Sequence, residues 1–473
     1  MENRKVIIVG AGIGGLSAGY WLSQRGYDVE ILEASDRPGG RMAILERKGD
    51  RVDVGAQFYH SNFRNVLGMI DAMGLSGAKR IIAGNVHYRL QDGSSFVYDH
   101  RVPYMKLLGL RGNLKLYWFI LKYVFFGHQF PLYGVTKDIP EYDDTEVLEL
   151  FKSPADKPLR DYLVTTVSMG ENTGLPEWLN LYHFIHQFRM TTFTKFIGLT
   201  RGVASLAEEL AKRLPIQYEA RVRQIVVEHG RVVGVEMENH GVVKKAGHVV
   251  VAVTPPSAAR LMPEGFEEQR EFFDSVIYAP VPMPVFFLDR PLRKDVWCYF
   301  NDPAQRRTFM FAIDEHAKVP EMSPSGKAVL TGWSGHPMTL DMIDRPDDEI
   351  IGKAKEDIEL MIPGFSNWIE EATVFRHPYA TPRFPVGSYR QMLDFLKRAE
   401  QLKGVSFVSD LFGLASMEGT TVSAAAAVRR VCQWGGTASC LRGANGQEAP
   451  SSLPGGHGRP RIRPARKDAA KEV

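Results

Sequence analysis

The stretch VIIVGAGIGGLSAGYWLSQRGYDVEILEA, residues 6–34, decides which fold this sequence predicts. It opens with a short β-branched run that ends in glycine, the pattern of a strand buried on both faces of a parallel sheet. Residues 14–25 are typical of a helix, which Gly26 closes, and residues 27–34 are typical of a second strand. A strand, a helix and a second strand in this order predict a βαβ unit and therefore an α/β fold.

The turn between the first strand and the helix carries glycines in the spacing G-x-G-x-x-G, at Gly10, Gly12 and Gly15. The first glycine permits a tight turn, the second allows a pyrophosphate to approach the backbone, and the third lets the helix lie close to the strand. Glu33 ends the second strand about 20 residues later, where a carboxylate accepts hydrogen bonds from a ribose. Strand, turn, helix and acid together favour dinucleotide binding over a glycine-rich turn without a ligand.

The residues that follow, EASDRPGGR at 33–41, indicate which dinucleotide is bound. A nicotinamide enzyme needs only the acid, whereas here Gly39 and Gly40 let the backbone fold beside a ligand. Arg41 comes next and offers a rigid fork of donors to a phosphate. Solvated surface charge is the alternative explanation for the arginines, and it suits Arg37 better than Arg41, which directly follows two glycines.

Length and composition set bounds on the architecture and on the partners. A chain of 473 residues with 44% hydrophobic and 24% charged residues is long enough for two or three domains with a sizeable core. Its net charge of +3 gives no reason to expect nucleic acid as a partner. We expect a cytoplasmic protein, because the three cysteines suit neither a disulfide framework nor a metal site, and the sequence shows no secretory signal and no membrane-spanning run.

Changes of sequence character along the chain predict two interleaved domains. A discontinuous Rossmann-type domain is expected to comprise residues 1–75, 200–264 and 375–434. An α+β substrate domain is expected to comprise residues 76–199, which are rich in aromatic side chains, and residues 265–374. The tail, residues 435–473, holds seven Gly, four Pro and seven Lys/Arg against three Asp/Glu, and is predicted to be disordered and basic.

Residues 6–41 resemble, over their whole length, the N-terminal fingerprint of the flavin-containing amine oxidase superfamily. That superfamily includes monoamine oxidases, protoporphyrinogen oxidases, phytoene desaturases and the GDP-dissociation inhibitors of small GTPases. The resemblance implies an FAD cofactor, with Glu33 at the adenosine ribose and Arg41 beside the pyrophosphate. It also implies that Gly14 and Ala34 belong to the cofactor site.

Two distant segments resemble other parts of the same cofactor site. Residues 219–235, EARVRQIVVEHGRVVGV, are similar to the hairpin whose valine, here Val222, offers its backbone to adenine. Residues 408–428, VSDLFGLASMEGTTVSAAAAV, resemble the C-terminal flavin motif, in which an acid, here Asp410, meets the ribityl-phosphate side. The site residues that the resemblance implies are Gly10, Gly12, Gly14, Gly15, Glu33, Ala34, Arg41, Val222, Asp410, Met417, Glu418 and Gly419.

The turn from Met417 to Gly419 starts a helix in both interpretations of this segment. In the superfamily, the N–H groups of this helix start face the flavin's pyrimidine carbonyl. A helix N-terminus stabilises negative charge, which a reduced flavin carries. Without the resemblance, Ser416 and Gly419 would be interpreted only as a capping box that frames a helix start.

Several segments bear on the substrate. LASMEG, residues 414–419, and VFFLDRPL, residues 285–292, resemble plant-type phytoene desaturases. Residues 378–389 resemble a segment in which monoamine oxidases carry a cysteine bonded to the flavin; Ser388 stands there, which implies non-covalent FAD. Amine oxidases also place a lysine near the flavin in the stretch that corresponds to residues 278–289, which has none. Both absences weigh against amine oxidation.

The aromatic section in the middle of the chain favours a lipophilic substrate. Residues 116–126, LYWFILKYVFF, contain one lysine and follow Arg111 and Lys115. They are too short to span a bilayer, and they suit either a helix in a membrane interface or a buried helix of the substrate domain. His183 and His186 lie one helical turn apart among aromatic residues, which favours core or cavity lining over a metal site without further ligands.

The residues and the resemblance together predict an FAD-dependent oxidoreductase that desaturates a lipophilic isoprenoid or carotenoid-type substrate by hydride transfer to flavin N5. Oxygen or a quinone is the expected electron acceptor, and peripheral membrane contact is compatible with the sequence. The alternatives are a protoporphyrinogen-type oxidase, a polyene isomerase, an amine oxidase and a non-enzymatic escort of prenylated proteins. No catalytic base is predicted; Arg376 and Tyr389 are candidates for the cavity by position only, and structural roles are favoured for both.

Overall fold

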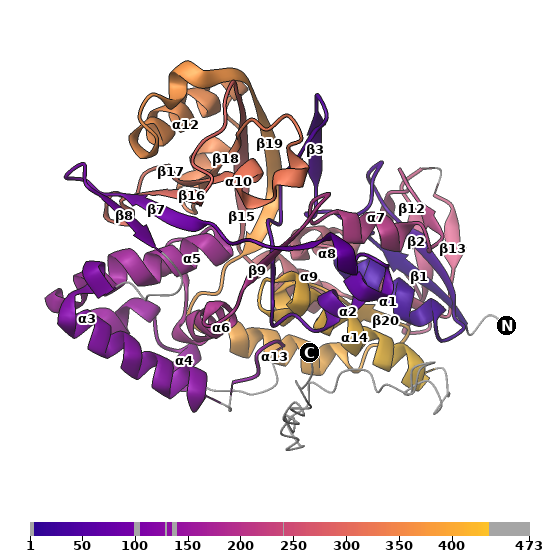
Figure 1. Ribbon diagram of the computed structural model, residues 1–473. Helices are drawn as coiled ribbons and strands as arrows, with labels where there is room; N and C mark the ends of the chain where they lie inside the picture. Colours follow the sequence, from indigo (N-terminus) through magenta and orange to yellow (C-terminus); the bar gives the residue numbers. More distant parts are fainter. Residues whose placement is uncertain (1–3, 99–104, 128–129, 135–139, 240, 435–473) are drawn as a thin grey trace, which may run out of the picture.

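The computed structural model of the chain describes residues 4–98, 105–127, 130–134, 140–239 and 241–434, and the predicted basic tail lies outside them. The described residues form two large sheets, three small ones and a group of helices. In Figure 1 the parallel sheet lies at the right, the antiparallel sheet with α12 lies at the top, and helices α3 to α6 lie at the lower left. None of the helices in these ranges is long and apolar enough to cross a membrane.

The first large sheet is parallel and confirms the predicted α/β class. Its order is β10-β2-β1-β14-β20, with every neighbouring pair parallel. The strands are β10 (Ile216–Gln217), β2 (Asp28–Leu32), β1 (Lys5–Val9), β14 (His248–Val251) and β20 (Val405–Phe407). All of them come from the three segments expected to form the Rossmann-type domain, so this sheet assembles parts of the chain that are far apart in sequence.

The predicted βαβ unit is present as β1, α1 (Ile13–Ser23) and β2. Gly10 has a φ of +102°, and a Cβ on it would lie 2.6 Å from the Ala252 oxygen. A Cβ on Gly15 would lie 1.9 Å from the Gly10 oxygen. Only glycine permits this turn and this close approach of helix to strand, as the spacing of the glycines predicted.

The predicted hairpin is also confirmed. It consists of β11 (Val222–Glu228) and β12 (Arg231–Met237), which pair antiparallel and are extended by β13 (Val243–Lys245). His229 and Gly230 form its turn with φ values of +51° and +72°. Two central residues with positive φ match the twist of the flanking strands.

The second large sheet has seven strands in the order β19-β15-β18-β17-β16-β7-β8. Only β16 and β7 pair parallel. The strands are β19 (Ile369–Pro382), β15 (Tyr278–Leu288), β18 (Val329–Ser334), β17 (Phe309–Asp314), β16 (Val296–Asn301), β7 (Asn85–Arg89) and β8 (Ser95–Tyr98). β19 runs across the predicted domain limit at residue 375, because one continuous strand connects the two parts of the molecule.

Alternating side chains of β15 point to opposite faces of this sheet. Phe286 and Leu288 pack with α12, which spans Asp347–Met361. Val281 and Met283 point to the opposite face, where they line a cavity. The sheet therefore separates a helix-covered core from the cavity described below.

The remaining elements are short. The small sheets pair β3 (Ile44–Arg47) with β4 (Asp50–Asp53), and β5 (Tyr59–His60) and β6 (Lys79–Ile81) with β9 (Phe196–Leu199). The other α-helices are α2 (Asn65–Ala72), α3 (Met105–Phe119), α4 (Pro140–Asp143), α5 (Thr165–Asn172), α6 (Leu181–Thr191), α7 (Ser205–Ala211), α8 (Pro255–Leu261), α9 (Glu267–Ser275), α10 (Glu315–Lys318), α11 (Met338–Met342), α13 (Ser388–Ala399) and α14 (Met417–Trp434).

The aromatic segment is helical and is buried on one side only. α3 is kinked at Gly109 and continues as a π-helix, η3, over Ile120–Phe125. One side of these helices is buried through Leu116, Phe119 and Tyr123. The other side exposes large apolar side chains, which with Phe193 are called the apolar rim: Leu110, Leu114, Tyr117, Trp118, Leu121, Phe125, Phe126 and Phe193.

The two histidines of α6 are core residues, as the sequence favoured. His183 and His186 are fully buried, and the His183 ring stacks on Phe384 at 3.8 Å between centroids. Burial lowers the pKa of His186 to about 3, so its ring is neutral in the folded protein. Neither histidine lines the cavity.

Candidate functional site

A cavity of about 1400 Å³ is lined by both large sheets and by the helices between them. At one end lie the residues that follow the carboxyl ends of β1, β2, β14 and β20. In open parallel sheets, ligands bind at this edge. At the other end lie aromatic side chains and part of the apolar rim.

Most of the site residues implied by the resemblance gather at the first end. The ones that line the cavity are Gly10, Gly12, Gly14, Glu33, Ala34, Arg41, Asp410 and Met417. The ones that do not line it are Gly15, Val222, Glu418 and Gly419. Gly15 serves the close packing of α1 on β1, and Val222 opens the hairpin opposite Met237. Gly419 packs so closely on Gly413 that neither position has room for a Cβ.

The glycine-rich loop leaves room for a phosphate group. A Cβ on Gly12 would meet no atom within 4 Å, so the space in front of this backbone is open to the cavity. The Gly39 N–H donates to the Ala11 carbonyl at 2.8 Å. This hydrogen bond brings Gly39 and Gly40 against the glycine-rich loop. The Glu33 carboxylate accepts from the Ala11 N–H at 2.7 Å and from the Ser35 N–H at 2.9 Å. These hydrogen bonds hold the glycine-rich loop and the acid next to each other at the edge of the parallel sheet.

Arg41 and Asp410 meet across the cavity wall, although 369 positions separate them in sequence. Arg41 Nη1 donates to Asp410 Oδ2 and to the Ala380 carbonyl, both at 2.7 Å. The Tyr278 hydroxyl donates to Asp410 Oδ1 at 2.5 Å. Burial alone would raise the pKa of Asp410, but the Arg41 charge and these hydrogen bonds outweigh it and lower the pKa. The Arg41 side chain stays 34% exposed, so it remains available to a ligand in the cavity.

The start of α14 has a side-chain cap and a second connection. The Ser416 hydroxyl accepts from the Gly419 N–H at 3.0 Å, which confirms the predicted helix start. The Glu418 carboxylate accepts from the N–H groups of Arg64, Asn65 and Val66 at 2.8–2.9 Å. The Glu418 side chain therefore caps α2 and does not face the cavity, a role that the local sequence does not indicate.

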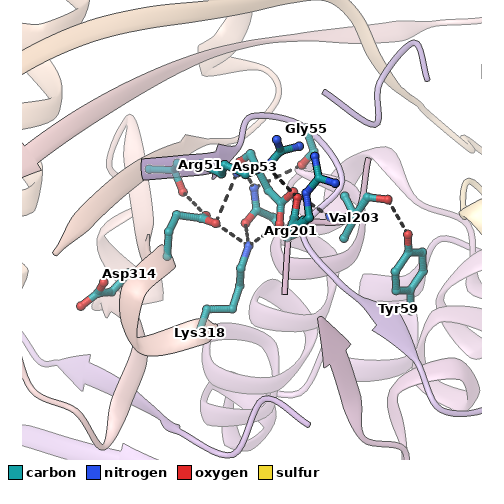
Figure 2. A network of polar contacts seen from close by, with 12 residues as sticks. Arg51, Asp53, Gly55, Tyr59, Arg201, Val203, Asp314 and Lys318 are labelled. Atoms are coloured by element: carbon teal, nitrogen blue, oxygen red, sulfur yellow. Dashed lines mark hydrogen bonds and ion pairs between the residues drawn. The ribbon is translucent and has the colours of Figure 1, made fainter. Parts of the chain in front are cut away.

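A buried ionic cluster supports the segment between β4 and β5 (Figure 2). Lys318 is fully buried and donates to Asp53 Oδ2 at 2.9 Å and Gln57 Oε1 at 2.7 Å, and it pairs with Glu315 at 2.6 Å. Asp53 Oδ1 accepts from the Val203 N–H at 2.9 Å. Burial raises the pKa of Glu315 to about 8. The cluster fixes Gln57, which lines the cavity together with its neighbours Gly55 and Ala56.

The second end of the cavity has aromatic walls and one acid–base pair. Phe58, Trp297, Phe311 and Trp333 are among its lining residues. The pair consists of His60 and Glu171, with Nε2 and Oε2 3.2 Å apart. The sequence analysis assigned no role to either residue, because they are 111 positions apart and neither belongs to a recognisable motif.

Two other reactive groups line the cavity, and their surroundings keep them neutral. His377 Nε2 lies 2.5 Å from the Val54 carbonyl, and burial lowers the pKa of His377 to about 4. Burial also raises the pKa of the Cys298 thiol far above its ordinary value. Neither group is suited to take up a proton or to act as a nucleophile at neutral pH.

Three residues considered from the sequence lie away from the cavity. Arg376 donates to the carbonyls of Ile343 and Arg345, and Tyr389 is hydrogen-bonded to His183 at 2.8 Å. Both therefore have the structural roles that were favoured. Ser388 starts α13 and does not line the cavity; in its segment, Ala380 and Thr381 do.

Comparison with known proteins agrees with this geometry. The profile of the family described as flavin-containing amine oxidoreductase matches residues 13–432. A phytoene desaturase of Fusarium fujikuroi is 33% identical over 109 residues, which are 22% of this chain and 19% of the desaturase. A mitochondrial protoporphyrinogen oxidase of Nicotiana tabacum is 24% identical over 184 residues, 38% of this chain and 35% of that protein. The chain thus matches much less than half of the length of these relatives.

Solved structures share the fold over nearly the whole chain. Putrescine oxidase bound to putrescine has a TM-score of 0.69 at 16% identity and covers 91% of this chain and 98% of its own. A fatty acid isomerase from P. acnes also has a TM-score of 0.69 at 16% identity and covers 91% and 99%. Identities this low establish the fold and leave the substrate open.

Proposed function

Because the chain belongs to the family of flavin-containing amine oxidoreductases and is therefore an FAD-dependent oxidoreductase, we propose that it dehydrogenates a lipophilic, isoprenoid- or carotenoid-type substrate. The observation that carries this proposal is the character of the cavity. Its second end is walled by aromatic rings and opens at the apolar rim, through Tyr117, Leu121, Phe125 and Phe193. Such walls bury hydrocarbon well and offer few partners to a charged molecule.

The residues at the first end of the cavity fit FAD held without a covalent bond. The open backbone at Gly12 and the side chain of Arg41 would take the pyrophosphate, and Glu33 would take the adenosine ribose. Met417, at the start of α14, would lie toward the redox-active ring, where the helix N-terminus favours negative charge. When bound, FAD supplies a hydride acceptor, and oxygen or a quinone is the electron acceptor that we propose for its reoxidation.

Amine oxidation is the alternative that the family name raises. The cavity-lining part of β15 consists of Val281 and Met283 and provides no lysine. Glu171 is the carboxylate that the second end offers to a diamine, but it already pairs with His60, and most of the wall around it is hydrocarbon. A protoporphyrinogen-type oxidase is favoured next, because a porphyrinogen is bulky and apolar and the tobacco oxidase is similar over the longer segment. A polyene isomerase would use the same chamber without net oxidation.

The experiment that tests the function is anaerobic mixing of the purified holoenzyme with candidate substrates. Phytoene-like polyenes, porphyrinogens and amines are added in turn, and the flavin absorbance is followed. We expect bleaching by polyenes, because the aromatic chamber buries their whole length. Bleaching by amines alone would contradict the proposal, and bleaching by porphyrinogens alone would replace it with the second candidate.

We further propose that the apolar rim rests on a membrane surface, so that a cytoplasmic protein takes its substrate directly from lipid. The rim exposes Leu110, Leu114, Tyr117, Trp118, Leu121, Phe125, Phe126 and Phe193, with Leu110 at 81% and Phe193 at 76%. Lys122 lies among them, with Nζ 5.0 Å from the centre of the Trp118 ring. An exposed apolar surface with interspersed cations is typical of a helix that lies in a lipid interface.

Vesicle flotation tests the membrane contact independently of the reaction. The wild-type protein should float with anionic phospholipid vesicles, and a double variant Leu114→Glu, Phe193→Glu should stay in the dense fraction. Leu340→Glu, an equally apolar surface position on α11 that is 53% exposed, is the matched control and should float like wild type. Equal flotation of all three proteins would contradict the proposed contact.

A further inference from the structure

A carboxylate and an imidazole meet on the wall of the apolar end of the cavity. His60 ends β5, and Glu171 lies in the last turn of α5. Their side chains are only 2% and 10% exposed, and both line the cavity. The rings packed around His60, with centroids 5.2–5.5 Å away, are those of Phe58, Phe63 and Phe196. Placing a polar pair among aromatic rings costs desolvation energy, so this pair by itself lowers the stability of the folded protein.

The hydrogen bonds of the pair suit a change of protonation. His60 Nδ1 lies 3.2 Å from Thr194 Oγ1, and Thr194 Oγ1 lies 3.1 Å from the Thr191 carbonyl. The threonine hydroxyl donates to the ring nitrogen when the imidazole is neutral, and it donates to the Thr191 carbonyl and accepts from the ring when the imidazole is protonated. The pair therefore keeps its partners whether or not it has taken up a proton.

One oxygen of the carboxylate is free to meet a ligand. Glu171 Oε2 faces His60, while Oε1 makes no hydrogen bond to any residue that the structure describes. The other carboxylates and imidazoles that line the cavity within the described ranges are already engaged. Glu33 holds the glycine loop, Asp410 pairs with Arg41, and His377 contacts the Val54 carbonyl.

We propose that Glu171 accepts the proton that the substrate gives up during dehydrogenation, and that His60 is the residue that positions Glu171 and shares the added charge. This inference rests on the proposed function. Forming a double bond removes one hydrogen with its electron pair, as a hydride to the oxidised flavin, and a second hydrogen as a proton. The C–H bond on the neighbouring carbon breaks, its electrons become the second bond between the two carbons, and the proton passes to the Glu171 carboxylate.

The test uses the holoenzyme and the variant Glu171→Gln. Gln keeps the shape of the side chain and an oxygen for the His60 N–H, but it takes up no proton. With the substrate class that bleaches the wild-type flavin, we expect the anaerobic bleaching rate of the variant to fall by about 10²–10⁴-fold. Glu177→Gln is the matched control: the same change six positions along the chain, at a side chain that is 37% exposed and pairs with Arg306. Its rate should equal that of wild type.

Two further measurements separate proton transfer from a purely structural role. The affinity of Glu171→Gln for the oxidised product, measured by calorimetry, should match that of wild type. Glu171→Gly should regain part of its bleaching rate when acetate is added, because a small carboxylate then occupies the vacated space.

Each other result counts against the inference. A wild-type rate in Glu171→Gln, a loss of product affinity or FAD content in that variant, or the absence of acetate rescue would overturn it. If no substrate class bleaches the wild-type protein, the proposed function fails first and the inference fails with it. The two failures are therefore distinguishable.

Discussion

Lys318 contacts three side chains in a part of the molecule that water does not reach. Asp53, Glu315 and Gln57 come from two different parts of the chain, and the lysine contacts all three. Figure 2 shows Lys318 beside Asp53. Opposite charges packed this way stabilise little compared with apolar packing, but removing one partner leaves the other charge buried and unpaired. The positions of Gly55 to Gln57, which line the cavity, thus depend on the charged side chain of Lys318.

We predict that Lys318→Met lowers the free energy of unfolding by about 3–5 kcal/mol, because it strands the carboxylates of Asp53 and Glu315. Urea unfolding followed by circular dichroism measures the change. Lys327→Met is the control, since Lys327 pairs with Glu370 at a position 40% exposed, where such pairs contribute about 0–1 kcal/mol. Equal midpoints for the two variants would contradict the role assigned to Lys318.

Asp314 gives a prediction about pH. It is 1% exposed, and burial raises its pKa from 3.8 to about 7, although the N–H groups of His316 and Ala317 oppose the shift. A raised pKa means that the folded protein holds the proton more tightly than the unfolded chain does. The free energy of unfolding that this carboxyl contributes therefore falls as pH rises from about 4 to about 7.

Asp314→Asn removes the ionisation and keeps an oxygen for the two N–H groups. We expect the melting temperature of the variant to exceed that of wild type at pH 8, with the gap closing as pH falls toward 4. Calorimetric scans across this range measure the gap. Asp295→Asn, at a side chain 56% exposed and paired with Arg293, should show no gap of this sign. A gap that does not depend on pH would contradict the assignment to Asp314.

The sequence predicts individual site residues where the chemistry is local. The glycine spacing and Glu33 lie within one βαβ unit, and all of them except Gly15 line the cavity. The pairs Arg41–Asp410 and His60–Glu171 are different, because each joins positions more than 100 residues apart and depends on how distant elements pack. Arg41 and Asp410 were implied separately by the resemblance, whereas nothing in the sequence brings His60 to Glu171.

At the scale of elements, α2 takes the cap of its first turn from another helix. No side chain of its own segment caps it; the Glu418 carboxylate accepts from three of its N–H groups instead. This contact fixes α14 against α2, and α14 begins beside the cavity at Met417. The cap therefore helps to fix the position of Met417, at the start of α14, in the cavity wall.

We predict that Glu418→Ala lowers the free energy of unfolding by about 1–3 kcal/mol, because three N–H groups, two of them buried, lose their acceptor. Hydrogen exchange should accelerate at the amides of residues 64–66 and not in α12. Glu209→Ala serves as the control, since Glu209 pairs only with Lys212 on the surface of α7. If exchange at residues 64–66 stays as slow as in wild type, the cap does not hold α2.

The elements that the sequence predicts well are the ones with a local pattern. The first βαβ unit and the hairpin around His229 follow from periodicity and turn residues. The order of the seven-stranded sheet does not, because it places β7, from residues 85–89, beside β16, from residues 296–301. Register between such distant strands depends on packing that no single segment encodes.

At the scale of the whole molecule, the cavity belongs to both large sheets at once. Loops of the parallel sheet form its first end, and β15, β16, β17 and β19 of the other sheet form part of its second end. β19 also connects the two parts through one continuous strand. A ligand in the cavity therefore contacts elements from most of the chain.

We predict that FAD stabilises the molecule as a unit. At a free FAD concentration of 100 times Kd, the free energy of unfolding should rise by about 2.7 kcal/mol over the apoprotein. Thermal unfolding should release flavin fluorescence and lose secondary structure in one transition, and removing FAD should lower its midpoint. Flavin release well below the temperature at which secondary structure is lost would contradict this prediction.

The order of the strands has a consequence for how the protein is made. β1 and β2 leave the ribosome before the other strands of the parallel sheet, and β20, which completes this sheet beside β14, follows about 400 residues later. About 150 residues separate β14 from β20, so at about 5–20 residues per second the nascent chain waits roughly 8–30 s with the edge of β14 unprotected. Chaperones that shield exposed strand edges should therefore accompany its synthesis, and a ribosome that stalls before residue 400 leaves a chain that cannot close its nucleotide site.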